Sequence, residues 1–503
     1  MHEVCCPGRR LPVGSARENH RKGDLDLLRA LGSNPDLSCF AGASGHSHGS
    51  LDSSPSRVLG RKTVARTDLS NGTVDTGETR MSDERSVPGE AAGGGKRRGG
   101  HLYLQTNETA NAVIHYVRSP NVEISEVDRT LTGGTGSGPF KPISGQPSAP
   151  NAFEGAASVI LTPDLRFLFA TNGGDNSVSS FGVGADGSLT LLDVKPTGNA
   201  VTGRSGTAKS LAYSPSSGTL FVLHAFGPDH LRLMSVDDNG KLAVRLERYS
   251  VNTSDKADRV ATMVKLAPEG RFLFVGTTFD QPPTANPDGS AILWVRGPDG
   301  APKSIASNEP DPDGLVTFPV TGDGTLGAPS FHDANGGSPF YIAFLRSRPD
   351  TFIVGEAVGD GVAMGSIDSA GRVDIGPVVE IDTSAGKPSE LCWLAISPDD
   401  RMVFATNFGY SNISSFHIDG TELSIARDPA CPRVPGDGTF RALNGTVSSG
   451  PSDNWITPDG AYLYQIYGNA AKLVGYAVQP DGALQPVSST SIPYNSPQGL
   501  AGI

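Results

Sequence analysis

Three side chains that could carry acid–base chemistry stand at matching points of a repeated sequence pattern. Lys209 lies six residues before a turn proline, His224 lies nine residues after the same proline, and Glu356 lies nine residues after a related turn. A carboxylate, an imidazole and an ammonium group could supply a base, an acid and a cation if the fold brings them together. The same side chains could also simply solvate the end of a channel, so both interpretations stay open.

The repeated pattern is a unit of short strands joined by tight turns. The line LTPDLRFLFATNGGDNSVSSFGVGADGSLTLL at 161–192 returns at 396–423 as ISPDDRMVFATNFGYSNISSFHIDGTEL, so that Pro163 corresponds to Pro398. Further copies are centred on Pro215, Pro268, Pro458 and, in a degenerate form, Ser347. Each copy alternates strand and turn four times, which predicts a four-stranded antiparallel sheet.

The number and arrangement of the copies predict an all-β fold, a seven-bladed β-propeller. One sheet cannot bury both of its faces, whereas sheets stacked radially around an axis can. The first copy, HLYLQTNETANAVIHYV, begins at its second strand, and the last residues, SPQGLAGI, resemble the inner strands of the other copies. We therefore expect the C-terminal strand to complete the first blade and to close the ring.

Composition separates a tail at 1–98 from the propeller at 99–503. The tail has 15 Lys/Arg against 12 Asp/Glu, a net charge of +3, and the remainder has 26 against 41, a net charge of −15. The tail is rich in Ser, Gly and Arg, so we expect it to be disordered, or largely absent from the natural protein if Met81 is the true start. A polar, proline-rich insertion near 280–313 is expected to form a loop outside the ring.

The charge, the apolar stretches and the histidine and cysteine content also exclude several classes of function. The acidic body has no basic stripe for nucleic acid, and no stretch approaches the ~20 apolar residues of a membrane-spanning helix. His46 and His48 are too few for a structural metal site, and no phosphate-cradling glycine loop follows a strand, so we expect no metal and no cofactor. Outside the tail only Cys392 and Cys431 remain, which favours a reduced, cytoplasmic compartment unless the natural N-terminus directs export. We expect a monomer.

Equivalent positions of the blades are expected to ring one mouth of the central channel. Antiparallel pairing should place the residue six before each turn proline opposite the residue nine after it, giving fourteen such positions. Besides the three ionisable side chains above, they include Thr262, Tyr341, Asn172 and Asn407. We expect the two asparagines to hydrogen-bond neighbouring turns, and Cys392 and the adjacent Trp393 to be packed. Rigid strands at such a mouth position ligands well.

The repeated unit resembles the seven-bladed β-propeller lactonase family, which includes bacterial 6-phosphogluconolactonases and the fungal carboxy-cis,cis-muconate cyclase. The resemblance covers about 100–503. The acidic residue of the family's catalytic set is matched by Glu356 in VGEAVGD. The family's His-Pro-His strand is matched by RVATMVKLAPEG, with Thr262 in the key position, and its Gly-Pro-Arg-His by GSPFYIAF, with Tyr341 in place of Arg. Its SNRGHDSI is matched by TNFGYSNI, so Phe408 stands in place of a second Arg.

The resemblance implies a lactone hydrolase, or an enzyme like 3-carboxymuconate cyclase, that acts on a small lactone at the channel mouth. Glu356 would be the general base, assisted by His224 or Lys209. The substrate would be bound by Tyr341, Phe408, Asn407, Asn172 and Thr262. Because aromatic side chains replace the arginines that clamp an anion, neutral lactones should be preferred. The alternative is a non-catalytic propeller that binds a small ligand or a protein partner.

Overall fold

The computed structural model divides the chain into two units, Met1–Glu90 and Ala91–Ile503. The structure describes residues 99–120, 122–138, 156–200, 206–252, 259–278, 314–334, 338–357, 359–382, 389–440, 446–495 and 499–503. All of these belong to the second unit. The predicted tail at 1–98 and the predicted insertion near 280–313 lie outside the described residues, and the expectations about them stay predictions.

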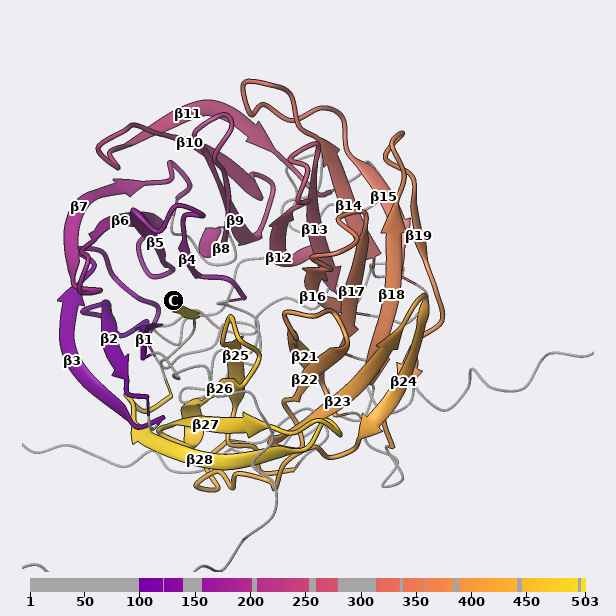
Figure 1. The fold of residues 1–503 in the computed structure, drawn as a ribbon. Coiled ribbons are helices and arrows are strands. Elements are labelled where there is room, and N and C mark those ends of the chain that lie inside the picture. Colours follow the sequence, from indigo (N-terminus) through magenta and orange to yellow (C-terminus); the bar gives the residue numbers. More distant parts are fainter. Residues whose placement is uncertain are drawn as a thin grey trace, which may run out of the picture. The chain divides into compact units, whose positions relative to one another are not determined.

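The described residues form seven antiparallel sheets arranged in a ring around a central axis (Figure 1). The predicted all-β, seven-bladed propeller is therefore confirmed. From the channel outward, the sheets are β29-β1-β2-β3, β4-β5-β6-β7, β8-β9-β10-β11, β12-β13-β14-β15, β16-β17-β18-β19, β21-β22-β23-β24 and β25-β26-β27-β28, with β20 as an extra strand on β18. We number these sheets blades 1 to 7 in this order.

The two strands nearest the channel form an inner hairpin in every blade except blade 1. The innermost strands are β29 Leu500–Gly502, β4 Val159–Leu161, β8 Gly206–Ser214, β12 Val260–Leu266, β16 Pro339–Phe344, β21 Leu391–Ile396 and β25 Pro451–Ile456. The second strands are β1 Gly100–Gln105, β5 Phe167–Asn172, β9 Thr219–Phe226, β13 Phe272–Thr278, β17 Thr351–Glu356, β22 Met402–Asn407 and β26 Tyr462–Tyr467.

The two outer strands of each blade face the rim. The third strands are β2 Ala112–Arg118, β6 Ser177–Val183, β10 Leu231–Val236, β14 Gly314–Pro319, β18 Gly361–Ile367, β23 Asn412–Asp419 and β27 Lys472–Val478. The fourth are β3 Ile124–Leu131, β7 Leu189–Pro196, β11 Leu242–Tyr249, β15 Ser330–Asp333, β19 Val373–Ile375, β24 Glu422–Arg427 and β28 Leu484–Ser491, and β20 covers Val379–Glu380. A 3₁₀ turn, η2 Gly468–Ala470, follows β26, and in the described part of the chain no helix is long and apolar enough to cross a membrane.

The hydrophobic core lies in the interfaces between successive blades, which we call seams. Strand β5 shows why, because its side chains alternate between two partners. Leu168 packs in the seam with Tyr103 of blade 1, and Phe169 packs in the next seam with Val222 of blade 3. All six residues of β5 are buried. Each inner sheet is thus apolar on both faces, which explains the nearly continuous apolar runs in the sequence.

The inner hairpins turn at the prolines that mark the repeat. In three of these turns a hydroxyl group donates a hydrogen bond to an aspartate two residues later: Thr162 to Asp164, Ser397 to Asp399 and Thr457 to Asp459. The same hydroxyl oxygen accepts the backbone N–H at the start of the following strand. This local bonding explains why S/T-P-D recurs in the sequence, since it fixes a tight turn without help from other blades.

The inner hairpins differ from the predicted register by a recurrent β-bulge. In blade 3, Ser210 lies opposite Leu223 but Ala208 lies opposite His224, which leaves Lys209 as the extra residue. The same irregularity falls between Ala261 and Val264, Pro339 and Tyr341, Leu391 and Leu394, and Pro451 and Asn454. The predicted pairing of the two mouth positions is therefore wrong in blades 3 to 7. A bulge bends the strand and redirects its side chains, here at the channel.

The ring is closed by the C-terminal strand, as predicted. Strand β29 pairs antiparallel with β1, with Leu500 opposite Leu104 and Gly502 opposite Leu102. Backbone hydrogen bonds continue the pairing, from His101 N to Ile503 O at 3.2 Å and from Ile503 N to His101 O at 2.9 Å. Figure 1 shows the C-terminus beside β1 on the inner side of the ring. First and last residues of the propeller thus share one sheet.

Deleting residues 499–503 should destabilise the propeller by several kcal/mol, because β1 loses its inner neighbour and each lost backbone hydrogen bond contributes about 1 kcal/mol. Urea unfolding followed by circular dichroism measures this loss. Removing residues 1–98 is the matched control and should leave the melting temperature within a few degrees. A C-terminal deletion that unfolds like the parent would show that β29 does not hold the ring together.

Candidate functional site

Three of the predicted residues nine positions after the turn, Asn172, His224 and Glu356, face the seam with the preceding blade at the mouth end of their strands. Asn172 accepts a hydrogen bond from Asn111 of blade 1, and His224 is bonded to Thr197, which follows the last strand of blade 2. Glu356 lies two residues after Val354, whose side chain packs against blade 4. Strand alternation therefore directs Glu356 toward blade 4 as well. Each of these side chains faces the preceding blade.

His224 is a fully buried histidine whose two ring nitrogens are both engaged. Its Nδ1 donates to the carbonyl oxygen of His230 at 3.2 Å, and its Nε2 accepts from the hydroxyl of Thr197 at 2.9 Å. Burial penalises the imidazolium ion and lowers the pKa of His224 to about 3. This geometry favours a structural role in the seam over the predicted role in catalysis.

The two predicted asparagines brace the second and third strands of their blades. Asn172 Nδ2 donates to the hydroxyls of Ser177 and Ser179 at 3.0 and 2.8 Å. Asn407 Nδ2 donates in the same way to Asn412 Oδ1 at 2.8 Å and to Ser414 at 2.7 Å. The sequence predicted bonds to a neighbouring turn, and these bonds reach the third strand of the same blade. Their amide groups are used within the fold, so substrate binding by them stays a prediction without a contact that supports it.

Lys209 and Thr262 each donate a hydrogen bond to the next blade, and the bond of Thr262 ends at the strand pair that carries Glu356. Lys209 Nζ donates to the carbonyl oxygen of Ala261 at 3.0 Å. The next residue, Thr262, donates from Oγ1 to the carbonyl oxygen of Pro339 at 3.0 Å, and Pro339 lies opposite Glu356 in the sheet. All three side chains are fully buried. Blades 3, 4 and 5 are thus linked by polar side chains at the mouth of the channel.

A glycine of blade 4, Gly276, allows the hydroxyl of Thr262 to approach the carbonyl oxygen of Pro339. A Cβ atom added to Gly276 would lie 2.4 Å from Thr262 Oγ1 and 3.0 Å from the Pro339 carbonyl oxygen. Any side chain at this position would therefore displace the hydrogen bond between blades 4 and 5. Gly276 belongs to β13, and the sequence alone gives no sign that it touches the channel.

Phe408 belongs to an aromatic cluster in the core between blades 5 and 6. Phe340 contacts Trp393 with ring centroids 4.8 Å apart, and Phe408 lies 6.4 Å from Trp393 and 5.5 Å from Phe440. Phe408 is only 1% exposed, so it is part of a packed cover and not the wall of an open mouth. Trp393 packs between blades, as expected. Tyr341 packs against this cluster and also lines a cavity described below.

Asp453 is an ionisable channel residue that the sequence interpretation missed. It lies in the bulge of blade 7, where its carboxylate accepts the backbone N–H of Leu500 at 3.3 Å and that of Asn454 at 3.0 Å. Burial raises the pKa of Asp453 to about 8, although backbone hydrogen bonds and the charge of Lys265 oppose this shift. One signal could have found it: five residues before the turn proline, the other blades carry Ser158, Ser210, Met263, Ile342 and Trp393, none of them acidic.

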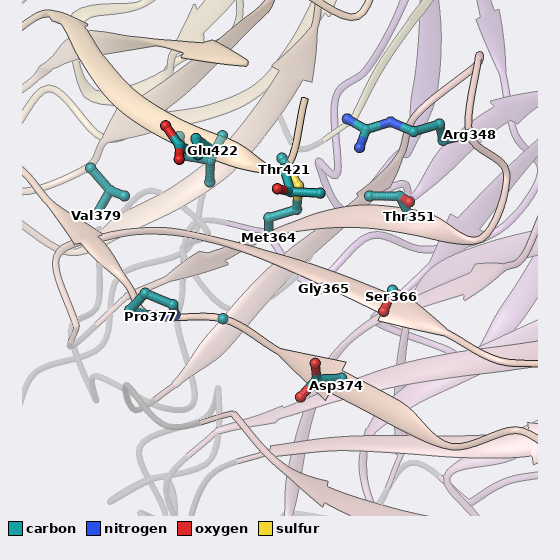
Figure 2. Close-up of a pocket in the computed structure, with 12 residues that line it drawn as sticks. Arg348, Thr351, Met364, Gly365, Ser366, Asp374, Pro377, Val379, Thr421 and Glu422 are labelled. Atoms are coloured by element: carbon teal, nitrogen blue, oxygen red, sulfur yellow. The ribbon is translucent and has the colours of Figure 1, made fainter. Parts of the chain in front are cut away.

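The cavities in the described part of the propeller include two that lie beside blades 5 and 6. One, of about 510 Å³, is formed by the innermost strands of blades 4, 5 and 6, and its ionisable lining residues are Lys265, Tyr341, Arg346 and Asp400. The other, of about 430 Å³, lies at the rim between blades 5 and 6. Figure 2 shows Thr421 and Glu422 on one side of this rim groove and Asp374 and Pro377 on the other. Neither cavity is lined by Lys209, His224 or Glu356.

The rim groove forms where the outer strand of blade 5 is interrupted. Strand β19 pairs with Gly365–Ile367, and β20 pairs with Gly361 and Val362 of the same strand. Gly376 and Pro377 separate the two pieces, since proline cannot donate to the ladder. The described residues contain no group of three or more His, Cys, Asp or Glu side chains close enough to hold a metal ion.

Comparisons with known proteins identify the fold. No family model and no curated protein matches the chain. Among solved structures, the periplasmic gluconolactonase of Pseudomonas aeruginosa matches with a TM-score of 0.55 and 15% identity over 81% of this chain and 99% of its own. Proposed 6-phosphogluconolactonases of Bacteroides uniformis and Bacteroides fragilis match with TM-scores of 0.56 and 0.53 and 13% and 14% identity, over 80% of this chain and 99% and 98% of theirs.

The chain has the fold of these lactonase-like propellers. At identities of 13–15% the likeness establishes the fold alone. The resemblance predicted from the repeated unit is confirmed to that extent. Which lactone the chain would act on, and whether it resembles a muconate cyclase in activity, are matters for a proposal.

The raised pKa of Asp453 predicts a pH-dependent contribution to stability. In the unfolded chain this carboxyl group titrates near 3.8, so between pH 4 and about 8 the folded protein holds a proton that the unfolded chain has released. Stability should therefore fall as pH rises through this window. Asp453→Asn should remove this slope, so that its stability relative to the parent increases with pH. Urea unfolding between pH 5 and 8 measures it, with Asp374→Asn as control. Parallel curves for the parent and Asp453→Asn would contradict the burial of this group.

Proposed function

We propose that the propeller hydrolyses a small lactone at the mouth of its channel. The observation that supports this proposal is the full burial of Lys209, Thr262 and Glu356, a cation, a hydroxyl and a carboxylate, on the inner strands of three successive blades, the first two hydrogen-bonded to the next blade. Ionisable groups buried at one end of a rigid ring are typical of a reaction site more than of a framework. The lactonase-like fold supports the same reaction class.

Glu356 would act as general base in this reaction. It would take a proton from a water molecule that attacks the lactone carbonyl carbon, and the resulting oxyanion would be stabilised by the Lys209 ammonium group. The ring C–O bond would then break, and the proton held by Glu356 would pass to the leaving alkoxide. One lactone and one water give one hydroxy acid. Thr262 would position the mouth strand through its bond to Pro339.

The aromatic cover shapes the substrate that such a site would accept. Phe340, Phe408 and Phe440 are each at most 3% exposed, so a substrate must displace part of this cover to reach the buried groups. A neutral lactone loses less hydration than a phosphorylated one on entering such surroundings. We therefore propose a neutral lactone as the substrate. His224, held in another seam, takes no part in this scheme.

Glu356→Gln should reduce the rate of lactone hydrolysis at least ~100-fold, because general-base catalysis contributes about 10²–10⁴ to rates. Initial rates on δ-valerolactone, glucono-δ-lactone, 6-phosphogluconolactone and muconolactone, followed by pH-stat, measure this. Glu422→Gln, at the rim groove, is the matched control and should keep the parent's rate. Melting curves of both variants verify that they fold.

Three outcomes would decide against this assignment. Full activity of Glu356→Gln would remove the proposed base, and a clear preference for the phosphorylated lactone would contradict the neutral substrate. If the parent hydrolyses none of the four lactones faster than a heat-denatured sample, the non-catalytic propeller is the better description. Turnover of muconolactone alone would favour the cyclase-like alternative.

A further inference from the structure

The cavity of about 510 Å³ lies apart from the proposed reaction site. It is formed by β12, β16 and β21, which Figure 1 shows as neighbours on the inner side of the ring. Its lining reaches Pro268, Arg346 and Asp400, which belong to the turns of the inner hairpins. The innermost strands run from the mouth to these turns, so the cavity lies toward the opposite end of the channel. Its volume is within the range of about 300–1,000 Å³ usual for small-molecule sites.

Two cations of this cavity have no counterion of their own. Lys265 is half-buried, and among the described residues its ammonium group has no hydrogen bond or ion pair. Burial lowers the pKa of Lys265, and the interaction with Asp453 opposes this shift. The guanidinium group of Arg346 likewise makes no hydrogen bond or ion pair within the described part of the chain. The partial burial of Lys265 makes its charge costly unless an anion joins it, whereas Arg346 is exposed and adds its charge at the cavity entrance.

The carboxylate of Asp400, in the cavity lining, already accepts two hydrogen bonds. Asp400 accepts the backbone N–H groups of Arg346 at 3.0 Å and Ser347 at 2.6 Å, across the seam between blades 5 and 6. These bonds hold the pKa of Asp400 below its ordinary value, so it stays an anion that ties the two turns together. Lys265 and Arg346 share the cavity lining with this one carboxylate, and Asp453, which also interacts with Lys265, holds its proton up to about pH 8, so one positive charge is in excess at neutral pH.

The remaining lining is apolar apart from one phenol. Ala343, Phe344, Leu345, Leu394 and Ile396 supply aliphatic and aromatic surface, and Tyr341 adds a hydroxyl. Burial and the nearby charge of Asp453 raise the pKa of Tyr341 well above its usual value, so this hydroxyl is a hydrogen-bond donor at neutral pH. The cavity thus combines an apolar floor with two cations and a donor.

We propose that this cavity is a binding site for a small organic carboxylate with an apolar body. The carboxylate would bind between Lys265 and Arg346, with Tyr341 as an additional donor, and the apolar body would lie against the side chains of β16 and β21. Charge-assisted hydrogen bonds to the carboxylate supply the specificity, and burial of the apolar body supplies most of the remaining affinity. Binding at this site does not depend on the proposed hydrolysis.

Isothermal titration of the full chain with 4-phenylbutyrate tests the proposal. The neutral alcohol 4-phenyl-1-butanol should bind at least tenfold more weakly, because hydrogen bonds to charged groups are worth about 1.5–3 kcal/mol, or about 10–100-fold in affinity. Lys265→Met should weaken binding of the carboxylate by a similar factor. Lys472→Met, the same substitution at an exposed lysine of β27, should leave it unchanged. Arg346→Gln, at an exposed position, gives a second variant should Lys265→Met fail to fold.

Further titrations distinguish binding in this cavity from binding at the mouth and from binding of other ligand classes. Glu356→Gln should bind 4-phenylbutyrate like the parent, because Glu356 does not line the cavity. Loss of binding in that variant would place the ligand at the mouth and overturn the proposal. Equal affinity for the alcohol, or full affinity in folded Lys265→Met and Arg346→Gln, would also overturn it. Inorganic phosphate binding as tightly as 4-phenylbutyrate would show that the apolar surface contributes nothing, which contradicts the proposed ligand class.

Discussion

Burial of both faces of every inner sheet is the constraint on which the rest of this structure depends. A strand such as β5, buried at all six residues, needs a blade on each side, and only a closed ring supplies two neighbours to every sheet. Closure requires that the first blade obtain its inner strand from the other end of the chain, and β29 meets this need by pairing with β1. The ring then fixes where the strand ends lie, and those ends form the two sides of the channel.

The bulges of blades 3 to 7 turn this framework into a site. A regular strand directs its side chains only into the two seams, so a strictly regular inner strand would offer the channel little but backbone. An extra residue in β8 lets Lys209 reach the carbonyl of Ala261 in the next blade, and the bulge of β25 places Asp453 against Leu500. Polar groups at the channel therefore come from irregular positions, held in place by regular strands beside them.

The two sides of the channel differ in how their charges are treated. At the mouth, Lys209 and Glu356 are fully buried, an environment in which proton transfer and charge stabilisation are strong. Toward the turns, Lys265 and Arg346 border an open cavity, and neither makes an ion pair with a carboxylate among the described residues. Tyr341 lies between the two environments, since it packs against the aromatic cover and also lines the cavity. A chemical role suits the first environment, and recognition of an anion suits the second.

The sequence by itself determined the blades, their number and the closing strand, because turn prolines, S/T-P-D bonds and apolar runs are local features that need no other blade. It also determined the behaviour of Asn172 and Asn407, whose hydrogen bonds reach the adjoining strand. Only the tertiary structure decided that His224 is a seam residue and that Phe408 is covered. The tertiary structure also revealed the buried position of Asp453 and showed that Lys265 and Arg346 line the same cavity. The physical reason is that a one-residue bulge reverses the direction of the side chains near it, and what they then meet belongs to blades far away in the sequence.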